Sequence, residues 1–574
     1  MSTSGIYGLS GSGIDVDSMV KVGMLTKQNE YDKMYKKQVK NEWLKEAYAD
    51  VYSQLNTFSN STLSTYKMSY TTNPMTVTSS STAVATAVAN SNAVAMSHTV
   101  QVTKTASNAY LLTKEKLTRA NTSTTYPNDT TNTDKTASIK LKDVIFTSAQ
   151  QEELKNKLSS DTIKGSDTAI SFTIADGTGS DHTSATVSFT YDDILTNDET
   201  LNDFVSKVNA AGVNVTASYD STNDAISLYQ KDGGTDNKIT LTVKNDTTTE
   251  TDDYSRTLLN NLNLAKVTMS SKDGTATSTQ GDILSLSETS DTIEAAGTNA
   301  EAVIDGKTYS SSSNKISAAN VTYTLTSIGT STMSVSQDTD KIVENVKKFV
   351  EEYNTMLDSL NSKYNEKQYS DYGVLTKSQE DAMTSDQVTK WNEKAKSGLL
   401  YHNQTIAKIR SAMREALYTP VASVDSSYNS MMAIGIESTT DQGHVTLDED
   451  KLKKALAADP DCVYQIFASS GDVTTTKADG TTTTSTDYDK EGVINRLYDK
   501  LNDSLSTIKD YAGTSSSTSD SSTLGTLIQN LQTKMSDFKV KMDAYEELLY
   551  KKYDAMETAI AKLSAQYNYV SGSR

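Results

Sequence analysis

Residues 524–574 carry the most regular pattern of apolar and polar positions in the chain. Apolar residues follow one another in alternating steps of four and three, no proline interrupts them, and one extra step of four follows Leu549. This repeat predicts one long helix whose narrow apolar stripe forms the seam of a coiled coil, relaxed locally by the extra residue. The predicted oligomerisation seam comprises Leu524, Ile528, Leu531, Met535, Phe538, Met542, Tyr545, Leu549, Tyr553, Met556, Ile560 and Leu563.

The same alternation appears in two other stretches of the chain. One predicted helix begins near Asp17, with Asp15 or Asp17 as its N-cap, and ends before Pro74, and another begins after Asp338. A helix with so narrow a stripe forms no core alone, so each needs partners from its own chain, from other copies, or from both. The predicted seam of these leg helices comprises Leu44, Tyr48, Val51, Leu55, Phe58, Ile342, Val346, Phe349, Tyr353, Met356 and Leu360.

Between these helices, residues 75–335 change to the alternation that is typical of strands. Four segments predict half-buried strands with threonine on the solvent face, namely 99–103, 169–174, 186–191 and 238–243. Residues 213–219 and 225–229 flank a polar loop and predict a hairpin. A single helix is expected to interrupt the strands, with a capping box at residues 196–199 and Gly212 at its C-terminal end.

The C-terminal region before residue 524 predicts several shorter elements. Helices are expected at residues 387–397, 406–417, 452–456 and 494–508. Residues 469–487 are expected to form a low-complexity loop, and the Ser/Thr-rich residues 514–523 a linker. Two polar tracts, 121–134 and 272–281, are predicted domain boundaries.

The order helix, strands, helix predicts an α+β protein. Long terminal helices form a coiled-coil or helical-bundle stalk, the leg, and β-rich head domains are inserted between them. The expected parts are a flexible N-terminal segment with a helix (1–40), the N-terminal part of the leg (41–74), the first part of a β-rich head (75–130), an inserted outer head domain (131–285), the second part of the head (286–337), the C-terminal part of the leg (338–523) and the C-terminal coiled-coil helix (524–574).

Composition narrows the classes of function. With 54 basic and 73 acidic residues, the net charge is -19, which argues against nucleic acid as the main partner because phosphate binding needs a basic face.

One cysteine, Cys462, excludes an intramolecular disulfide. This fits a reducing compartment or a protein that is exported unfolded, and Cys462 is expected to be a buried small hydrophobe rather than a reactive thiol. Neither a cleavable signal peptide nor a membrane-inserted helix is expected, because residues 1–15 lack a basic and apolar start and no run of apolar residues is long enough.

No arrangement of residues predicts catalysis or a cofactor. The four histidines, His98, His182, His402 and His444, lie far apart, and none has the spacing of a zinc helix or a triad context. Asp-Gly sequences near residues 176–181 and 231–236 could bind calcium, but turn formation explains them equally well. The thirty-one tyrosines, several on the predicted seams, fit either core packing or an interface that is wet on one side.

Several segments resemble one family of flagellar axial proteins. The N-terminal GLSGSGIDVD (8–17) is similar to the start of flagellar filament cap proteins, the hook-associated protein 2 family. So are residues 304–309 (IDGKTY), 312–316 (SSNKI) and 321–325 (VTYTL), although Asn320 stands where the family usually has glycine. The similarity continues at 349–354 (FVEEYN), 387–400, 432–436 (MAIGI) and 447–452 (LDEDKL).

The resemblance implies a function in assembly. Such a protein leaves the cell unfolded through the flagellar type III export apparatus and forms a homo-oligomeric ring at the filament tip. There it promotes folding and insertion of flagellin, which filament elongation and motility require. The implied partners are other copies of the chain, flagellin, hook-filament junction proteins and an export chaperone. The implied location is extracellular, at the flagellum tip, and the protein is neither an enzyme nor dependent on a cofactor.

Two alternatives remain open at this point. The β-rich head could make the protein a surface adhesin that binds host mucin or glycan, and this role can coexist with capping. A flagellin or a hook-filament junction protein would belong to the same group of axial proteins, but residues 447–452 and 567–574 do not resemble flagellin.

Overall fold

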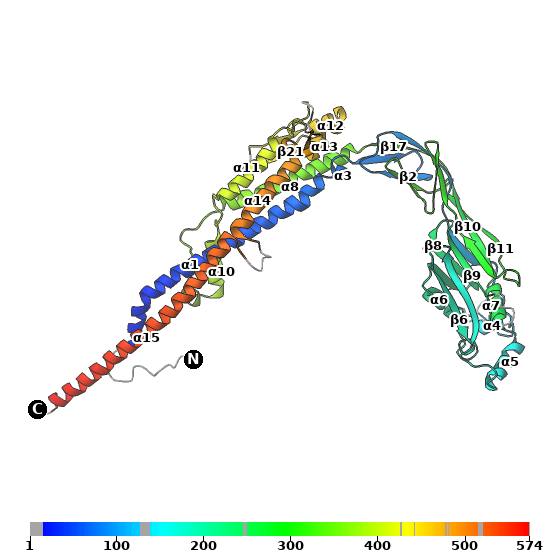
Figure 1. Cartoon of the computed structure of the whole chain (residues 1–574), viewed down its shortest axis with the longest axis horizontal. Coiled ribbons are helices and arrows are strands. Elements are labelled where there is room, and N and C mark those ends of the chain that lie inside the picture. The colour runs from blue at the N-terminus through cyan, green and yellow to red at the C-terminus, as the bar shows by residue number, and fades with distance from the viewer. Residues whose placement is uncertain are drawn as a thin grey trace. The chain divides into compact units, whose positions relative to one another are not determined.

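The structure is a computed structural model that describes residues 15–124, 126, 138–244, 250–424, 427–440, 442–476, 479, 481–514 and 520–572. It divides into two compact units, Met1–Pro74 with Asp338–Arg574 and Met75–Gln337. The first is mainly helical and is called the leg, and the second is mainly β and is called the β unit (Figure 1). The α+β class is confirmed, whereas the finer sequence-based division into seven parts stays a prediction. None of the described helices combines the length and the apolarity that a membrane crossing requires.

Two long helices from opposite ends of the chain run side by side in the leg (Figure 1). Helix α1 (Val16–Thr57) begins at Asp15, whose side chain accepts a hydrogen bond from the Ser18 amide, and continues into a π-helical segment, η1 (Phe58–Leu63). Helix α15 spans Thr523–Ser571. The other helices of the leg are α2 (Ser64–Tyr66), α3 (Ser69–Thr72), α8 (Thr339–Asn365), α9 (Lys377–Asp381), α10 (Ser385–Lys396), α11 (Gln404–Tyr418), α12 (Glu449–Ala458), α13 (Cys462–Ala468) and α14 (Val493–Ala512).

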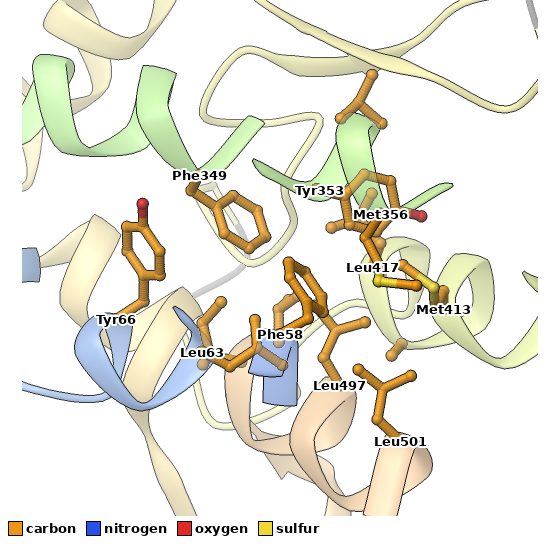
Figure 2. Packing of buried hydrophobic residues seen from close by; sticks show 14 of the residues in the cluster. Phe58, Leu63, Tyr66, Phe349, Tyr353, Met356, Met413, Leu417, Leu497 and Leu501 are labelled. Carbon is orange, nitrogen blue, oxygen red and sulfur yellow. The ribbon is translucent and has the colours of Figure 1, made fainter. Parts of the chain in front are cut away.

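One large apolar core, here called the leg core, holds most of these helices together. The C-terminal third of α1 packs with α8, α11 and α14, and Phe349 lies among the rings of Tyr66 and Phe467 at centroid distances of 5.3 and 5.1 Å (Figure 2). Each helix contributes a stripe of apolar residues, so that the stripes bury one another from several sides. The remaining parts of α1 and α15, residues 16–40 and 528–571, lie outside this core and are called the terminal arm.

The β unit has two apolar cores. The smaller lies between a five-stranded sheet, in the order β1-β17-β3-β13-β14, and a three-stranded sheet, β15-β16-β2. All the paired strands are antiparallel. Their bounds are β1 (Met75–Ser79), β2 (Ala85–Ala89), β3 (Ser97–Lys104), β13 (Ala300–Ile304), β14 (Lys307–Ser311), β15 (Lys315–Ala318), β16 (Val321–Leu325) and β17 (Gly329–Gln337).

The larger core of the β unit combines two further antiparallel sheets with helices. The sheet orders are β11-β10-β4-β8-β7 and β12-β9-β5-β6. The bounds are β4 (Asn108–Thr113), α4 (Leu141–Ile145), α5 (Ser148–Ser159), β5 (Thr168–Gly177), β6 (Ser184–Thr190), η2 (Asp192–Thr196), α6 (Leu201–Ala210), β7 (Val215–Asp220), β8 (Ala225–Gly233), β9 (Asn237–Thr242), α7 (Glu250–Asn261), β10 (Leu264–Lys272), β11 (Thr275–Ile283) and β12 (Thr292–Ala296). All four predicted strands and the 213–229 hairpin are confirmed.

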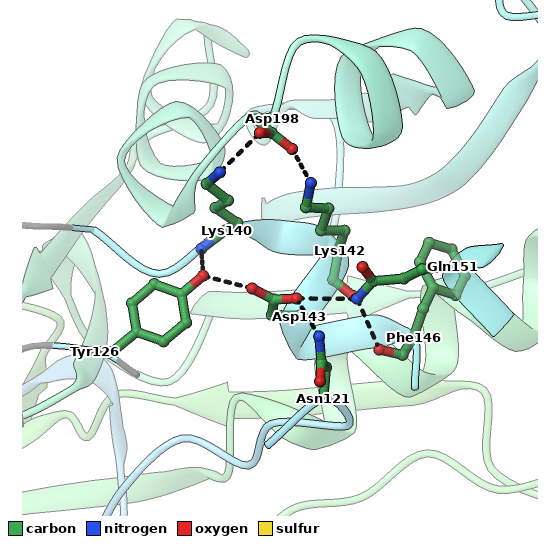
Figure 3. A network of polar contacts seen from close by, with 8 residues as sticks. All are labelled: Asn121, Tyr126, Lys140, Lys142, Asp143, Phe146, Gln151 and Asp198. Carbon is green, nitrogen blue, oxygen red and sulfur yellow. Dashed lines mark hydrogen bonds and ion pairs between the residues drawn. The ribbon is translucent and has the colours of Figure 1, made fainter. Parts of the chain in front are cut away.

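A buried carboxylate fixes the connection after β4. The Asp143 side chain, almost fully buried on α4, accepts hydrogen bonds from the Asn121 amide, the Tyr126 hydroxyl and the Gln151 amide at 2.6–2.9 Å (Figure 3). Above it, Asp198 pairs with both Lys140 and Lys142. A buried carboxylate with three donors keeps its hydrogen bonds satisfied, which limits the cost of its burial.

This network bears only on the start of the predicted boundary at residues 121–134. Asn121 and Tyr126 are buried, so the start of the tract belongs to the larger core, and residues 127–134 lie outside the described part. The second predicted boundary, 272–281, is wrong. It forms the turn of the β10–β11 hairpin and most of β11, whose nine residues are all exposed. Without a buried side to β11, its sequence lacks the apolar alternation that marks a strand.

Three other expectations about local structure are wrong. The predicted low-complexity loop at 469–487 contains a hairpin of β20 (Ser470–Thr476) and β21 (Thr482–Glu491), again with mostly exposed residues. The interruption of the strands by a single helix is incorrect, since α4, α5 and α7 also lie there. The capping box of α6 is Thr200 with Asp203 rather than 196–199, because Thr196 ends η2 and donates instead to Asp192.

Candidate assembly interface

The seam predicted for the leg helices lies in the leg core. Ten of its residues are buried, and Leu44 packs partly buried against them. The residues at its centre, Leu55, Phe349 and Tyr353, are completely enclosed. The structure therefore places these residues together within one chain, where they serve as core. Whether they also contact other copies stays a prediction.

The surroundings of the predicted oligomerisation seam differ from one end of α15 to the other. Toward its N-terminal end the stripe faces α1, and Leu524, Ile528, Leu531, Met535, Met542 and Leu549 are buried. Phe538 is half-buried beneath the Lys27 ammonium, which lies 5.6 Å from the ring centroid. Tyr545 is 36% exposed. This part of the seam is thus covered largely by the same chain.

Gly23 of α1 lies directly against the Leu549 side chain of α15. A Cβ atom at this position would lie 2.7 Å from Leu549 Cδ1, so any larger residue requires the Leu549 side chain to shift. Around it, Val16, Val20 and Leu549 form a separate small cluster with Met24, Tyr550 and Tyr553, and the Tyr550 hydroxyl donates to Asp17 at 3.1 Å. Glycine inside a helix costs about 1 kcal/mol relative to alanine. Close packing of the arm offsets that cost.

The last part of the seam becomes more exposed toward the C-terminus of α15. Tyr553, Met556 and Ile560 are half-buried, Leu563 is 67% exposed, and Tyr567 in the same phase is 73% exposed. Isolated exposed apolar residues are normal on protein surfaces, but a stripe that continues a buried seam at the same spacing points to a missing partner. In the described part of the chain, α15 is apolar further than α1 covers it.

A second exposed face of α15 is absent from the sequence-based interpretation. Val540 and Leu548 are 68% and 58% exposed, and with the exposed Ala544, Ala555 and Ala559 they form a stripe on another side of the helix from Leu549. On α1, Val22 and Leu25 are similarly exposed. The signal was available in the sequence, since these apolar residues recur at i and i+4 beside the main seam.

Polar contacts fix the helices around the leg core. The Tyr66 hydroxyl donates to Glu352 at 2.7 Å, and burial together with this carboxylate raises the pKa of the phenol. Lys363 pairs with Asp50 at 2.8 Å, and this hydrogen bond lowers the pKa of the Asp50 carboxyl. Arg496 is fully buried and donates to the carbonyl oxygens of Thr419 and Pro420, which holds α14 against the end of α11.

The tyrosines of the seams divide between the two interpretations. Tyr48 and Tyr353 are core residues, and the Tyr48 hydroxyl accepts a hydrogen bond from the Asn403 amide at 2.8 Å. Tyr545 and Tyr567 are exposed. Packing explains the first pair, whereas an interface that is wet on one side remains the prediction for the second.

The described residues contain no cluster of histidine, cysteine, aspartate and glutamate that could hold a metal ion. Asp176, one of the possible calcium ligands, is buried and accepts hydrogen bonds from Thr183 and the Asn214 amide instead. Three histidines lie beside single carboxylates, His98 with Asp305, His182 with Asp176 and His444 with Asp358. Cys462 is fully buried, as predicted, and burial raises the pKa of its thiol to about 12, which disfavours the reactive thiolate.

Comparison with known proteins finds one family at both ends of the chain. Residues 12–109 match the family described as "Flagellar hook-associated protein 2 N-terminus", and residues 297–565 match "Flagellar hook-associated protein 2 C-terminus". Together these ranges cover more than half of the chain.

Two relatives that carry this name agree with the match. Flagellar hook-associated protein 2 of Halalkalibacterium halodurans is 28% identical over 386 residues, which cover 64% of this chain and 67% of that protein. The protein of the same name from Thermotoga maritima is 27% identical over 251 residues, 42% of this chain and 35% of that protein. Among solved structures, the D1-D2-D3 domains of the flagellar cap protein FliD from Escherichia coli align with a TM-score of 0.46 at 19% identity, covering 85% of this chain and 99% of that one.

Proposed function

Because this chain belongs to the flagellar hook-associated protein 2 family, whose members are structural caps of the flagellar filament and not enzymes, we propose that it forms a homo-oligomeric ring at the filament tip. In that position it promotes the folding and insertion of exported flagellin, and so supports filament elongation and motility. The proposed partners are other copies of the chain and flagellin. Hook-filament junction proteins and an export chaperone are proposed partners on the family relationship alone.

The observation that carries the proposal is the apolar stripe of α15 beyond the cover of α1. Leu563 and Tyr567 continue the seam of Leu549 yet are mostly exposed. Burial of apolar area contributes about 25 cal/mol per Å², so covering these side chains on assembly would stabilise a bundle of terminal arms. A ring of identical subunits supplies such a partner at every position through repeated heterologous contacts.

Two apolar faces on one helix suit a ring better than a pair. The exposed end of the seam, Leu563 and Tyr567, faces one side of α15, and the stripe of Val540 and Leu548 faces another. A helix with one apolar face satisfies it with one neighbour, whereas a helix with two needs neighbours on both sides. The second face is therefore proposed to contact the terminal arm of an adjacent copy.

The narrow terminal arm also suits export in an unfolded state. Helices that depend on tertiary packing unfold easily when they are isolated and become stable when neighbours bury their stripes. The absence of any disulfide in a chain with one cysteine leaves no covalent obstacle to unfolding. Passage through the type III export apparatus is part of this proposal.

Exposed seam residues provide the test, because changing them leaves the folded chain intact. The variant Leu563→Asp with Tyr567→Asp is expected to fold normally but to shift the oligomer toward monomer in native mass spectrometry, and to shed flagellin into the medium of a producing strain. Asn568→Asp, exposed on another side of α15, is the matched control and should behave as the unchanged protein. Unaltered assembly and full-length filaments in the double variant would contradict the proposal.

The adhesin function stays a second proposal. The described β unit exposes many Ser and Thr side chains, for example along β11 and β21. Binding of immobilised mucin by a deletion variant that lacks residues 75–337, at the level of the full chain, would exclude this unit as the adhesive part.

A further inference from the structure

One stretch of the β unit carries no charged residue. Residues 75–103 contain no Asp, Glu, Lys or Arg, although these four types make up 22% of the chain. The stretch forms β1, β2 and most of β3, and it is not buried throughout, since Val88 is 74% and Val94 68% exposed. Exposed surface without charge is characteristic of the centres of protein–protein interfaces.

The three-stranded sheet β15-β16-β2 turns a nearly uncharged face outward. Strand register places Ser317, Thr322 and Val88 in one row across the sheet, and Lys315, Thr324 and Thr86 in the next. The alternate residues, such as Ile316, Tyr323 and Ala85, are buried in the smaller core. The hydroxyl groups of Ser317 and Thr322 form a hydrogen bond, with 3.0 Å between their oxygen atoms. We call the six outward residues the neutral face; Lys315 is its one charged member.

A shallow hollow of about 430 Å³ lies at one end of the neutral face. It is lined by Val88, Ala89, Asn90 and residues 317–322. Three asparagines fix its rim. The Asn90 amide donates to the Asn320 carbonyl at 3.0 Å, the Asn320 side chain donates to Asn92 at 3.2 Å, and the Asn92 amide donates to the Asn90 side chain at 2.8 Å. A surface that is already ordered loses little conformational entropy when a partner binds.

We propose that the neutral face packs against the β unit of a neighbouring copy of this chain. Electrostatic repulsion between copies favours this occupant. Each copy carries a net charge of -19, so two copies repel one another wherever acidic surfaces meet, and the repulsion is smallest where the approaching surface is uncharged. Lys315 lies on the edge strand β15, so Val88, Thr86 and Thr322 can pack against another copy while this one charge stays at the rim of the contact. The inference rests on the proposed ring and adds a second contact to that of the terminal arms.

The test introduces one charge into the neutral face of the full chain. Val88→Glu is expected to raise the dissociation constant of the oligomer by about tenfold or more, because the new carboxylate must be buried or must keep the copies apart. Met269→Glu is the matched control. It adds the same charge at a 48% exposed position on β10 in the same unit, and should change the constant by less than about twofold. Val88→Thr keeps the shape and neutrality of the position and should also assemble normally. Sedimentation velocity over a concentration series gives all three constants.

Hydrogen exchange of the unchanged protein supplies a second, independent measurement. Amides of residues 317–322 should exchange more slowly in the oligomer than in the monomer. Equal assembly of Val88→Glu and the unchanged chain, or equal exchange at 317–322, would overturn this inference while the proposed ring stands. Loss of flagellin binding in Val88→Glu without any change in assembly would also overturn it, since the occupant would then be flagellin. If the unchanged chain stays monomeric at every concentration, the proposed ring itself fails.

Discussion

The leg core and the terminal arm use the same two helices but stabilise them differently. In the leg core, α1 is surrounded by α8, α11 and α14, and residues such as Leu55 have no exposed surface. In the terminal arm, among the described residues, α1 and α15 pack mainly against each other, and the buried cluster of Val16, Val20 and Leu549 is small. A helix is therefore stable within this chain where several stripes meet, and depends on further partners where only two do. We therefore propose that folding depends on one segment of each long helix and assembly on another.

The largest effect is expected from a change in the leg core. Phe349→Ala removes a fully buried ring that contacts Tyr66 and Phe467, which should lower the free energy of unfolding of the leg by about 3–5 kcal/mol. Urea denaturation followed by helical circular dichroism measures this. Val540→Ala, at an exposed position of α15, should change the unfolding free energy by less than about 0.5 kcal/mol. Similar losses for both variants would remove the contrast between core and arm.

A change in the arm should affect assembly more than folding. Leu531→Asp with Phe538→Asp places two carboxylates on the seam of α15, which should weaken the pairing with α1 and lower the oligomer mass in light scattering, while the β unit stays folded. Gln529→Asp with Ser536→Asp has the same spacing on an exposed side and is the control. An unchanged oligomer mass in the seam variant would show that the arm is dispensable for assembly.

A larger side chain between the two arm helices should lower the stability of the arm by an intermediate amount and only locally. Gly23→Leu cannot be accommodated without displacing Leu549, and overpacking of this kind costs about 1–3 kcal/mol. Hydrogen exchange around residues 545–553 should become faster, with the leg core unaffected. Val22→Leu, at the adjacent exposed position, should leave exchange unchanged. Faster exchange in both variants would mean that the close approach at Gly23 is not what holds the helices together.

The smallest effect concerns the pH dependence of the leg core. Since the hydrogen bond from Lys363 lowers the pKa of Asp50 in the folded state, this pair stabilises the leg above the unfolded pKa of about 4, and the contribution is lost as pH falls through the lower folded value. Both side chains are partly exposed, so the contribution is between about 0 and 1 kcal/mol. Asp50→Asn should therefore be slightly less stable than the unchanged protein at pH 7 and equally stable at pH 2. A difference that persists at pH 2 would assign the effect to something other than charge.

The periodicity of apolar residues predicted the long helices and the strands of the cores because each of these elements buries one side. The stripes of α1, α8 and α14 and the alternation in β5 and β9 follow directly from such burial. The elements that were missed lack it. Strand β11 has no buried residue, and the hairpin of β20 and β21 extends largely into solvent, so backbone pairing alone defines them.

The candidate interface was predictable only in part. The seam from Leu524 to Leu563 could be read from its spacing, but the sequence does not say that Leu549 meets α1 of the same chain whereas Leu563 is exposed. That distinction depends on how far α1, which begins at Val16, extends along α15 in the folded leg. The positive φ of Asn320, 62°, in contrast, explains a departure from the family pattern. Asparagine replaces the usual glycine at a position where both tolerate the left-handed conformation.

Hydrogen exchange of the full chain, measured separately in the monomer and in the assembled state, tests the central claim most directly. In the monomer, amides of α8 and α14 in the leg core should be strongly protected, while those of α15 from residue 553 to residue 571 should exchange rapidly and become protected only on assembly. Equal protection of the leg core and the terminal arm in the monomer, with no further change on assembly, would contradict the account.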